Sequence, residues 1–167
     1  MERRSLLKIL TGAVSTALAA TVAAPILAVL GHPLRRRAVE AGLLPVADLE
    51  SLPEGVPTRA AVIAPSLVDA WTRFEKVALG AVWLVRRGGE VRALSTTCPH
   101  AGCFVDWEAR AGRFACPCHA SAFDLDGKTV AGPAPRPMDA LEVEVRDGRV
   151  LVRFQRFRQA RSDKTPV

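Results

Sequence analysis

The sequence has no tyrosine, and aromatic residues make up only 5% of its 167 positions. No internal repeat is present, which excludes a solenoid architecture. No glycine-rich phosphate-binding loop occurs either, since Gly88-Gly89 is typical of a turn, so we do not expect a nucleotide site. Much of the net charge of +6 lies in short basic clusters whose only interleaved aromatic residues, Phe154 and Phe157, belong to or follow the last expected strand, and we therefore expect no nucleic-acid binding.

Charged residues are absent from Ile9–Leu30, a run of 22 positions. As a helix this run would extend about 33 Å, enough to cross a bilayer core. The hydrophobic region of a secretory signal is usually shorter, which favours a retained single-pass anchor, although the alanines leave Ala-x-Ala cleavage sites open. The preceding Glu2–Lys8 resembles a twin-arginine export signal. Arg35–Arg37 follows the run, so charge gives no clear orientation, and we expect this cluster to meet lipid headgroups.

Cysteine and histidine are scarce, with four and three copies, and nearly all of them fall in two short segments. These segments are Cys98-Pro-His100-Ala-Gly-Cys103 and Cys116-Pro-Cys118-His119-Ala-Ser121. Each contains a Cys–His pair at a metal-ligand spacing and one further cysteine. Thiolates and imidazoles from two loops can hold an iron–sulfur cluster or a zinc ion. Two of each is the ligand set of a Rieske 2Fe–2S centre.

The two segments resemble the cluster-binding loops of Rieske iron–sulfur proteins, and Gly132–Pro137 resembles the proline loop that covers the cluster in that family. The resemblance extends over about Val91 to Val152. It implies one 2Fe–2S cluster, with Cys98 and Cys116 on one iron and His100 and His119 on the other. It also implies a Cys103–Cys118 disulfide, which is typical of the quinol-oxidising branch and requires an oxidising compartment or strong burial.

Two positions near the second loop bear on the reduction potential. Ser121 matches a serine that donates a hydrogen bond to a bridging sulfide in the family. The family's tyrosine donor aligns with Phe123, so one donor is missing. We therefore predict a potential below that of members with both donors, suited to a low-potential quinol such as menaquinol. Ala101 stands where many members carry a larger apolar residue.

The family resemblance favours the Rieske subunit of a cytochrome bc-type quinol:cytochrome c oxidoreductase. Such a subunit takes an electron and a coupled proton from quinol, through a hydrogen bond to His100 or His119, and passes the electron to a cytochrome. Cytochrome b and a c-type cytochrome would be its partners, and the chain alone would be an electron carrier. The export signal and the disulfide place its head on the periplasmic side of the cytoplasmic membrane.

Two alternatives stay open at this stage. A Rieske subunit of a periplasmic molybdenum oxidase, such as an arsenite oxidase, would also carry a twin-arginine signal. A structural zinc site could use the same four ligands in a closed tetrahedron and would give no electron chemistry. Zinc, however, leaves Cys103, Cys118 and the proline loop without a role.

We expect an all-β fold, a Rieske-type antiparallel β-sandwich with an inserted cluster-binding subdomain, after one N-terminal transmembrane helix. Hairpins are predicted around Gly88-Gly89 and Asp147-Gly148. Trp71, Trp83 and Phe74 are expected in the core. The expected divisions are a cytoplasmic segment 1–8, an anchor 9–30, a flexible linker 31–57, a Rieske domain 58–157 with its cluster subdomain at about 96–137, and a basic tail 158–167.

Overall fold

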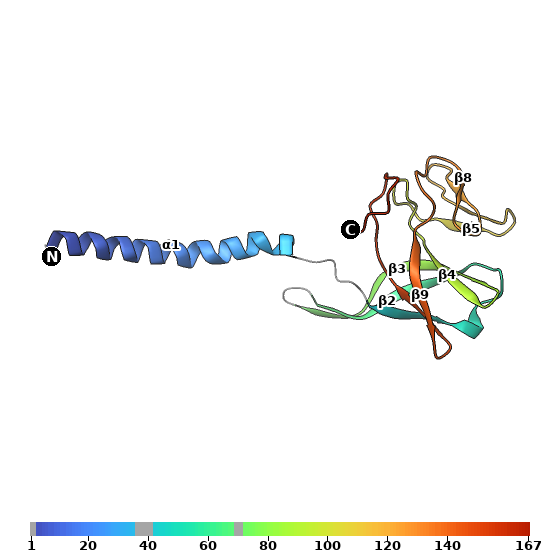
Figure 1. Ribbon diagram of the computed structural model, residues 1–167, viewed down its shortest axis with the longest axis horizontal. Coiled ribbons are helices and arrows are strands. Elements are labelled where there is room, and N and C mark those ends of the chain that lie inside the picture. Colours follow the sequence, from blue (N-terminus) through green and yellow to red (C-terminus); the bar gives the residue numbers. More distant parts are fainter. Residues whose placement is uncertain (1–2, 36–41, 69–71) are drawn as a thin grey trace. The chain divides into compact units, whose positions relative to one another are not determined.

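The computed structural model describes residues 3–35, 42–68 and 72–167 (Figure 1). The chain divides into two compact units, residues 1–39 and 40–167, and each is considered by itself. The side chains of the Arg35–Arg37 cluster and of Trp71 lie outside the described residues, so their expected roles stay predictions.

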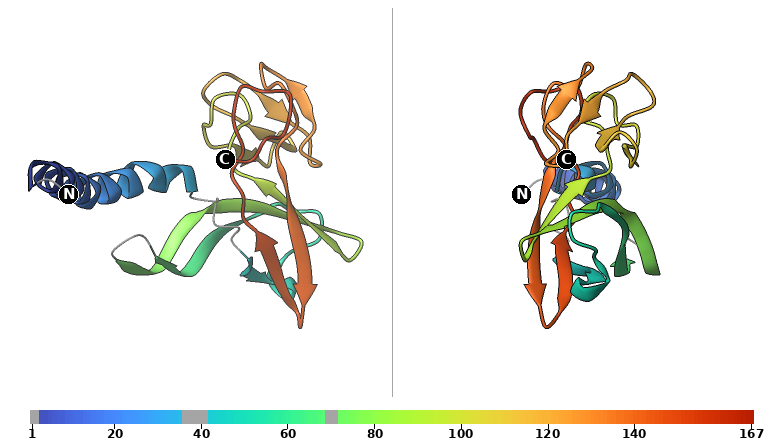
Figure 2. Two further views of the ribbon diagram at one scale, coloured as in Figure 1. Left: turned by 60° about the vertical axis from the view of Figure 1, so that its left-hand side comes forward. Right: turned by 90° about the vertical axis from the view of Figure 1, so that its right-hand side faces the viewer.

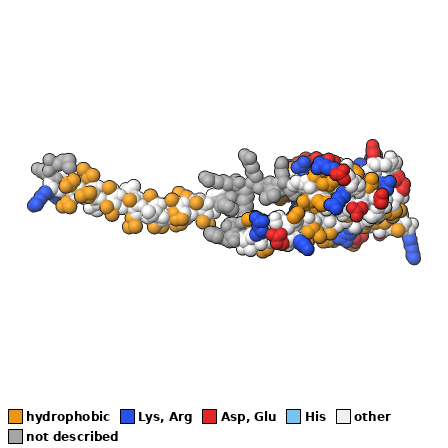
Figure 3. Space-filling view, turned by 90° about the horizontal axis from the view of Figure 1, so that it is seen from below, with side chains coloured by type: hydrophobic (Ala, Val, Ile, Leu, Met, Phe, Trp, Pro, Cys, Tyr) orange, Lys and Arg blue, Asp and Glu red, His pale blue; other side chains and the backbone are white. Residues whose placement is uncertain are grey.

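The described residues of the first unit form the helix α1 (Arg3–Arg35), which includes the expected span. Its side chains from Arg3 to Leu30 are exposed, and most of them are aliphatic. Apolar side chains cover the visible face of this helix in Figure 3, while both acidic and basic side chains are scattered over the second unit. By length and composition α1 can cross a membrane.

The second unit is built from two antiparallel sheets. The six-stranded sheet has the order β1-β10-β9-β4-β3-β2, and the four-stranded sheet has the order β5-β6-β7-β8. A short 3-10 helix, η1 (Leu49–Ser51), follows β1. The strands are β1 (Leu43–Asp48), β2 (Thr58–Val68), β3 (Arg73–Arg87), β4 (Glu90–Ser95), β5 (Asp106–Glu108), β6 (Arg113–Ala115), β7 (Ala122–Phe123), β8 (Thr129–Ala131), β9 (Ala140–Arg146) and β10 (Arg149–Arg153).

Both hairpins expected from the sequence are confirmed. β3 pairs with β4 around Gly88-Gly89, and β9 pairs with β10 around Asp147-Gly148. Each two-residue turn has positive φ at both positions, the geometry that matches the twist of paired strands. The smaller sheet is inserted between β4 and β9, so the expected subdomain within an all-β domain is also present (Figure 2).

Two hydrophobic cores stabilise this unit. The first lies within the six-stranded sheet and includes Val62, Val82, Val150 and Val152, all fully buried. The second joins that sheet to the smaller one. In it, Trp83 is 8% exposed, donates its Nε1–H to the carbonyl of Val105 at 2.9 Å, and packs on Phe114 with ring centroids 5.6 Å apart. Trp83 is thus a core residue, as expected.

The prediction of a linker over residues 31–57 is wrong from Leu43 onward, where β1 begins. β1 pairs antiparallel with β10, Leu44 opposite Val152, and Leu52 is 3% exposed in the first core. The prolines that suggested a linker are compatible with a strand here, because β1 is an edge strand and its register shifts between Pro45 and Ala47. At the edge of a sheet or at a bulge, the amide of a residue need not donate to a neighbouring strand. Proline, which has no N–H, is therefore tolerated there.

Phe74 was expected in the core and is 46% exposed, so that prediction is wrong. It pairs with Leu67 in the outer part of the β2–β3 hairpin, whereas β3 meets β4 only from Val82 onward. Residues 158–167 were predicted only as a basic tail, and the structure shows their backbone path. The tail folds back on itself, with the amide of Arg158 donating to the carbonyl of Thr165 at 2.9 Å.

Candidate metal centre

The two cysteine-containing segments form loops of closely similar backbone geometry. The amide of Cys98 donates to the carbonyl of Cys103 in the first loop, and the amide of Cys116 donates to the carbonyl of Ser121 in the second, both at 2.8 Å. Each loop turns through a left-handed residue five positions into its segment, Gly102 with φ of 83° and Ala120 with φ of 55°. Each loop is therefore closed across five residues and begins at a cysteine.

A disulfide joins the two loops. Cys103 and Cys118 are bonded with their Cα atoms 6.5 Å apart, the pairing that the family resemblance implied. The sulfur of Cys116 lies within 4.8 Å of both disulfide sulfurs, but bonded sulfurs are not available as thiolate ligands. Among the four cysteines the free thiols are Cys98 and Cys116.

The free donors form two pairs. Cys98 and Cys116 are 1% and 3% exposed and belong to the second hydrophobic core. The rings of His100 and His119 have centroids 4.8 Å apart and planes at 84°. His100 is half-buried and His119 is exposed. The site thus has a buried thiol pair and an imidazole pair that reaches solvent, an arrangement suited to two metal ions with different ligands.

Burial affects the acid–base chemistry of the thiols. Burial raises the pKa of the Cys98 thiol above its ordinary value, and a backbone hydrogen bond at His100 partly opposes this effect. Without a metal ion the neutral thiol is therefore favoured. Metal binding must displace this proton, because the thiolate is the form that ligates.

The third loop, residues 132–137, packs directly on the second. A Cβ atom placed on Gly132 would lie 2.4 Å from Ser121 Cα and 2.6 Å from the carbonyl oxygen of Ala120, and the φ of Gly132 is +85°. Only glycine fits this close approach of two backbones. Two residues later, Ala134 packs against the second core, which contains both free thiols. The loop therefore covers the thiol side of the site.

The Ser121 hydroxyl supplies the test of whether an iron–sulfur cluster fits. This residue is 1% exposed, and its Oγ forms no hydrogen bond of regular geometry, although it lies near enough to the Cys98 thiol to act to lower the pKa of that thiol. An unpaired buried hydroxyl is costly, about 1–3 kcal/mol, so it indicates a missing acceptor. A sulfide held by the neighbouring cysteines would provide one. Phe123 is fully buried two residues later and offers no donor.

The Rieske 2Fe–2S domain family matches residues 43–147, more than half of the chain. The chain belongs to the Rieske family. The match begins at β1 and includes both loops, the disulfide and the proline loop. A Rieske domain carries a 2Fe–2S cluster with two cysteine and two histidine ligands, and the two donor pairs and the orphaned Ser121 hydroxyl fit that group. A zinc module does not account for this membership.

Curated relatives of the Rieske domain match over part of their length. The chain is 41% identical over 71 residues to the cytochrome b6-f complex iron–sulfur subunit of Chlorobaculum tepidum, covering 42% of this chain and 39% of the relative. It is 40% identical over 85 residues to the menaquinol:cytochrome c reductase iron–sulfur subunit of Bacillus subtilis strain 168, covering 48% and 50%. The chain thus spans half or less of the length of these relatives.

Solved Rieske structures are also similar. The plasma membrane Rieske protein of Synechocystis PCC 6803 aligns with a TM-score of 0.46 at 28% identity, covering 68% of this chain and 99% of that one. A hyperthermophilic respiratory complex III chain aligns with a TM-score of 0.47 at 20% identity, covering 86% and 98%.

Sequence reasoning missed a buried ion pair in and next to the proline loop. Arg136, in the proline loop, donates from Nε and one terminal nitrogen to the two carboxylate oxygens of Asp139 at 2.9 and 2.8 Å. Both side chains are 6% exposed. The Asp139 carboxylate raises the pKa of Arg136 further above its ordinary value. Nothing in the residue pattern distinguished this arginine from the many exposed ones.

Proposed function

We propose that this chain is the electron-transfer subunit of a membrane quinol:cytochrome c reductase. The observation that carries the proposal is the paired imidazole edge, His100 beside His119, above two buried thiols. The curated relatives, named as iron–sulfur subunits of cytochrome b6-f and menaquinol:cytochrome c reductase complexes, support it. By analogy with those names, a cytochrome b and a c-type cytochrome are its proposed partners.

Each residue of the site has a proposed role. Cys98, Cys116, His100 and His119 hold the cluster, which supplies one-electron chemistry when bound. His119 is the more exposed of the two imidazoles and is the proposed contact for the quinol hydroxyl. A hydrogen bond from that hydroxyl to a ring nitrogen of His119 orients the quinol and gives its proton an acceptor. The buried thiols lie on the far side, away from solvent.

The hydrogen-bond donors near the site support a low-potential quinol. Ser121 provides one buried hydroxyl, and Phe123 provides none where a second donor would stand. Each donor stabilises the reduced, more negative cluster, so a single donor lowers the potential relative to two. Menaquinol is therefore the proposed electron donor.

We further propose that α1 anchors the subunit as a single span, with the Rieske head on the periplasmic side of the cytoplasmic membrane. The length and apolar surface of α1 support the anchor. The Cys103–Cys118 disulfide supports an oxidising compartment for the head, and the twin-arginine-like start supports export after cluster insertion.

The test is a redox titration of the full chain in detergent at two pH values, in which electron paramagnetic resonance measures the reduced cluster. A rhombic signal with a mean g value below that of the free electron, and a midpoint that falls as the pH rises into the alkaline range, is the expected result. Affinity purification from native membranes should also retain b- and c-type haem. Recovery of a molybdenum protein without haem b would instead identify the oxidase alternative.

A further inference from the structure

The C-terminal segment, residues 155–167, lies outside the matched region 43–147 and contacts the first cluster loop. We call it the C-terminal clasp. The amide of Ala160 donates to the carbonyl of Pro99 at 2.9 Å, and Ala160 itself has a left-handed φ of 56°. Pro99 is buried and stands between the two ligand positions Cys98 and His100. The clasp therefore holds the first loop at the peptide adjacent to His100.

The clasp is fixed in place by the buried pair of Arg136 and Asp139. While it binds Asp139 through two nitrogens, Arg136 donates from its remaining terminal nitrogen to the carbonyl of Arg161 at 2.7 Å. The carbonyl of Asp139 in turn accepts the amide of Ser95 at 2.8 Å. One guanidinium thus joins the proline loop to the clasp, and Asp139 joins both to the end of β4. Phe157, 6% exposed, anchors the start of the clasp in the first core.

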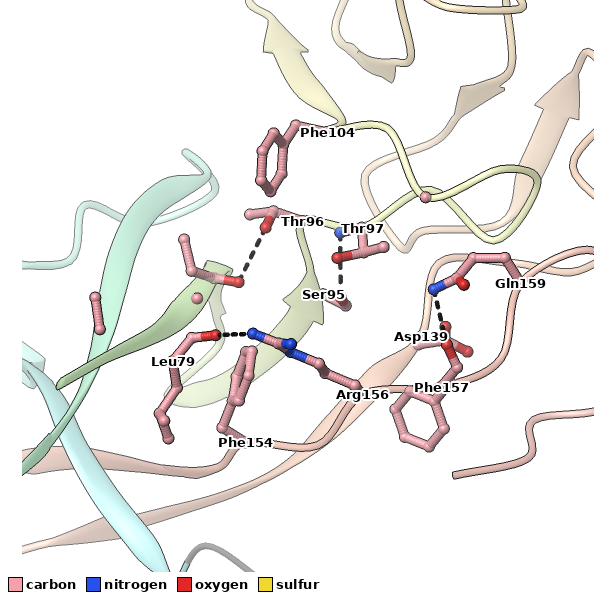
Figure 4. Close-up of a pocket in the computed structure, with 14 residues that line it drawn as sticks. Leu79, Ser95, Thr96, Thr97, Phe104, Asp139, Phe154, Arg156, Phe157 and Gln159 are labelled. Carbon is pink, nitrogen blue, oxygen red and sulfur yellow. Dashed lines mark hydrogen bonds between the residues drawn. The ribbon is translucent and has the colours of Figure 1, made fainter. Parts of the chain in front are cut away.

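A cavity lies next to the place where the clasp contacts the first loop. The cavity has a volume of about 370 Å³ and is lined by both the loop and the sheet, which Thr96 joins by donating its Oγ1–H to the carbonyl of Ala81 at 3.0 Å (Figure 4). Thr97, Gly102 and Phe104 line it from the loop, and Gln159 lines it from the clasp. A Cβ atom on Gly102 would lie 3.6 Å from Gln159 Cγ, so Gln159 lies over the turn of the loop. On this side the first loop is therefore bordered by a cavity, and the clasp supplies a contact there.

The two cluster loops differ in what supports them. The second loop is held by the backbone contact with Gly132, where no side chain fits. In the first loop, the glycine at the turn, Gly102, lies against Gln159 of the clasp instead. We propose that the C-terminal clasp, held by Arg136, is a positioning element that fixes the first cluster loop and thereby the orientation of His100. Loss of the clasp should loosen the first loop and leave the second unchanged.

Two chains truncated at the C-terminus test the proposed role of the clasp. Both keep the rest of the protein, including α1, and are loaded with the cluster in detergent. A chain ending at Gln159 loses both the Ala160 amide and the Arg161 carbonyl. A chain ending at Ser162 keeps both, and the two chains share the loss of residues 163–167. Hydrogen–deuterium exchange is followed by mass spectrometry for residues 97–104 and 115–122, with the disulfide reduced during the acid quench.

The chain ending at Gln159 should exchange in residues 97–104 about five- to tenfold faster than the chain ending at Ser162, the factor that corresponds to one net hydrogen bond. Residues 115–122 should differ by less than about twofold. Equal rates in the two chains, or equal acceleration of both loops, would overturn the proposal. No quinol is involved, so the outcome does not depend on the proposed electron donor.

Electron paramagnetic resonance of the same two proteins tests the effect on His100. The g values should shift further from those of the full chain in the chain ending at Gln159 than in the one ending at Ser162, which loses the Arg158–Thr165 bond but keeps the bonds to Pro99 and Arg136. Arg136→Gln should reproduce the shift. Arg136→Lys should recover only part of the native spectrum, because a lysine ammonium cannot bind both Asp139 oxygens and the Arg161 carbonyl from three separate nitrogens, as the planar guanidinium does. Faster exchange with an unchanged spectrum would mean that the clasp stabilises only the backbone of the first loop. That result would overturn its proposed role in orienting His100.

Discussion

Replacing Gly132 with alanine should separate the proline loop from the second cluster loop. The added Cβ would lie 2.4 Å from Ser121 Cα, 2.6 Å from the Ala120 carbonyl oxygen and 2.7 Å from the Ser121 nitrogen. Carbon atoms prefer separations of about 3.5–4.0 Å, so the shortfall exceeds about 1 Å. All three neighbours are backbone atoms that cannot rotate away. One of the two loops must therefore move as a whole.

The expected magnitude has two parts, and a second glycine isolates one of them. Alanine in the left-handed region costs about 1–2 kcal/mol, and forced overpacking adds about 1–3 kcal/mol. Gly112, in the β5–β6 turn, also has a left-handed φ, +62°, but a Cβ there would meet nothing within 4 Å. Gly112→Ala should therefore show the strain alone. At about 4 °C per kcal/mol for a domain of this size, we expect Tm losses of about 4–8 °C for Gly112→Ala and about 8–20 °C for Gly132→Ala.

Thermal unfolding of the cluster-loaded full chain in detergent, followed by circular dichroism and by visible absorbance, measures both effects. In Gly132→Ala the visible cluster band should disappear at a lower temperature than the β-sheet signal, because the loop over the thiol side has moved. In Gly112→Ala the two signals should fall together. Equal Tm losses in the two variants would refute the inference that the close contact at Gly132 holds the site closed.

Three further variants test other parts of the site. Ser121→Ala should lower the midpoint potential by several tens of millivolts in a redox titration, since the reduced cluster loses a donor worth about 1 kcal/mol. The double variant Cys103→Ser/Cys118→Ser should destabilise the fold to denaturant by about 3 kcal/mol, the value for a cross-link spanning 15 residues. Asp139→Asn should cost about 3–5 kcal/mol in the same assay, because it leaves Arg136 buried without its counter-charge.

Each of these variants has a matched comparison. Ser95 is also buried, but its Oγ accepts the amide of Thr97, so Ser95→Ala should leave the potential within about 10 mV of wild type. A similar potential shift in both serine variants would contradict a specific donor at Ser121. Asp126 pairs with two arginines at the surface, and Asp126→Asn should cost less than about 1 kcal/mol. Reduction of wild-type protein should reproduce the disulfide variant; a stable reduced protein would contradict that value.

The two cysteine-containing loops were predictable because metal-binding chemistry is local in sequence. Cysteine and histidine are rare in this chain, and metal ligation requires them at short spacings within two loops. The turns at Gly88-Gly89 and Asp147-Gly148 were predictable for a similar reason, since both residues of such a turn need positive φ. The relative exposure of His100 and His119 depends on how the loops meet, which the sequence left open.

The features that sequence reasoning missed all depend on contacts between distant segments. β1 is short, carries a proline and pairs with β10 about a hundred residues later, so its residues resembled a linker. The Arg136–Asp139 pair resembles any exposed charge pair until the fold buries it. Phe74 has the residue type of a core position, but the hairpin extends beyond the sheet and exposes it.

The position of β1 shortens the chain segment that connects α1 to the β-domain. A free linker over residues 31–57 would extend up to about 95 Å at full stretch, far enough to visit partners on opposite sides of a large complex. Because α1 ends at Arg35 and β1 begins at Leu43, only seven residues connect them, and these reach at most about 25 Å. For the function proposed above, this short connection predicts a much smaller reach for the β-domain than a linker over residues 31–57 would give.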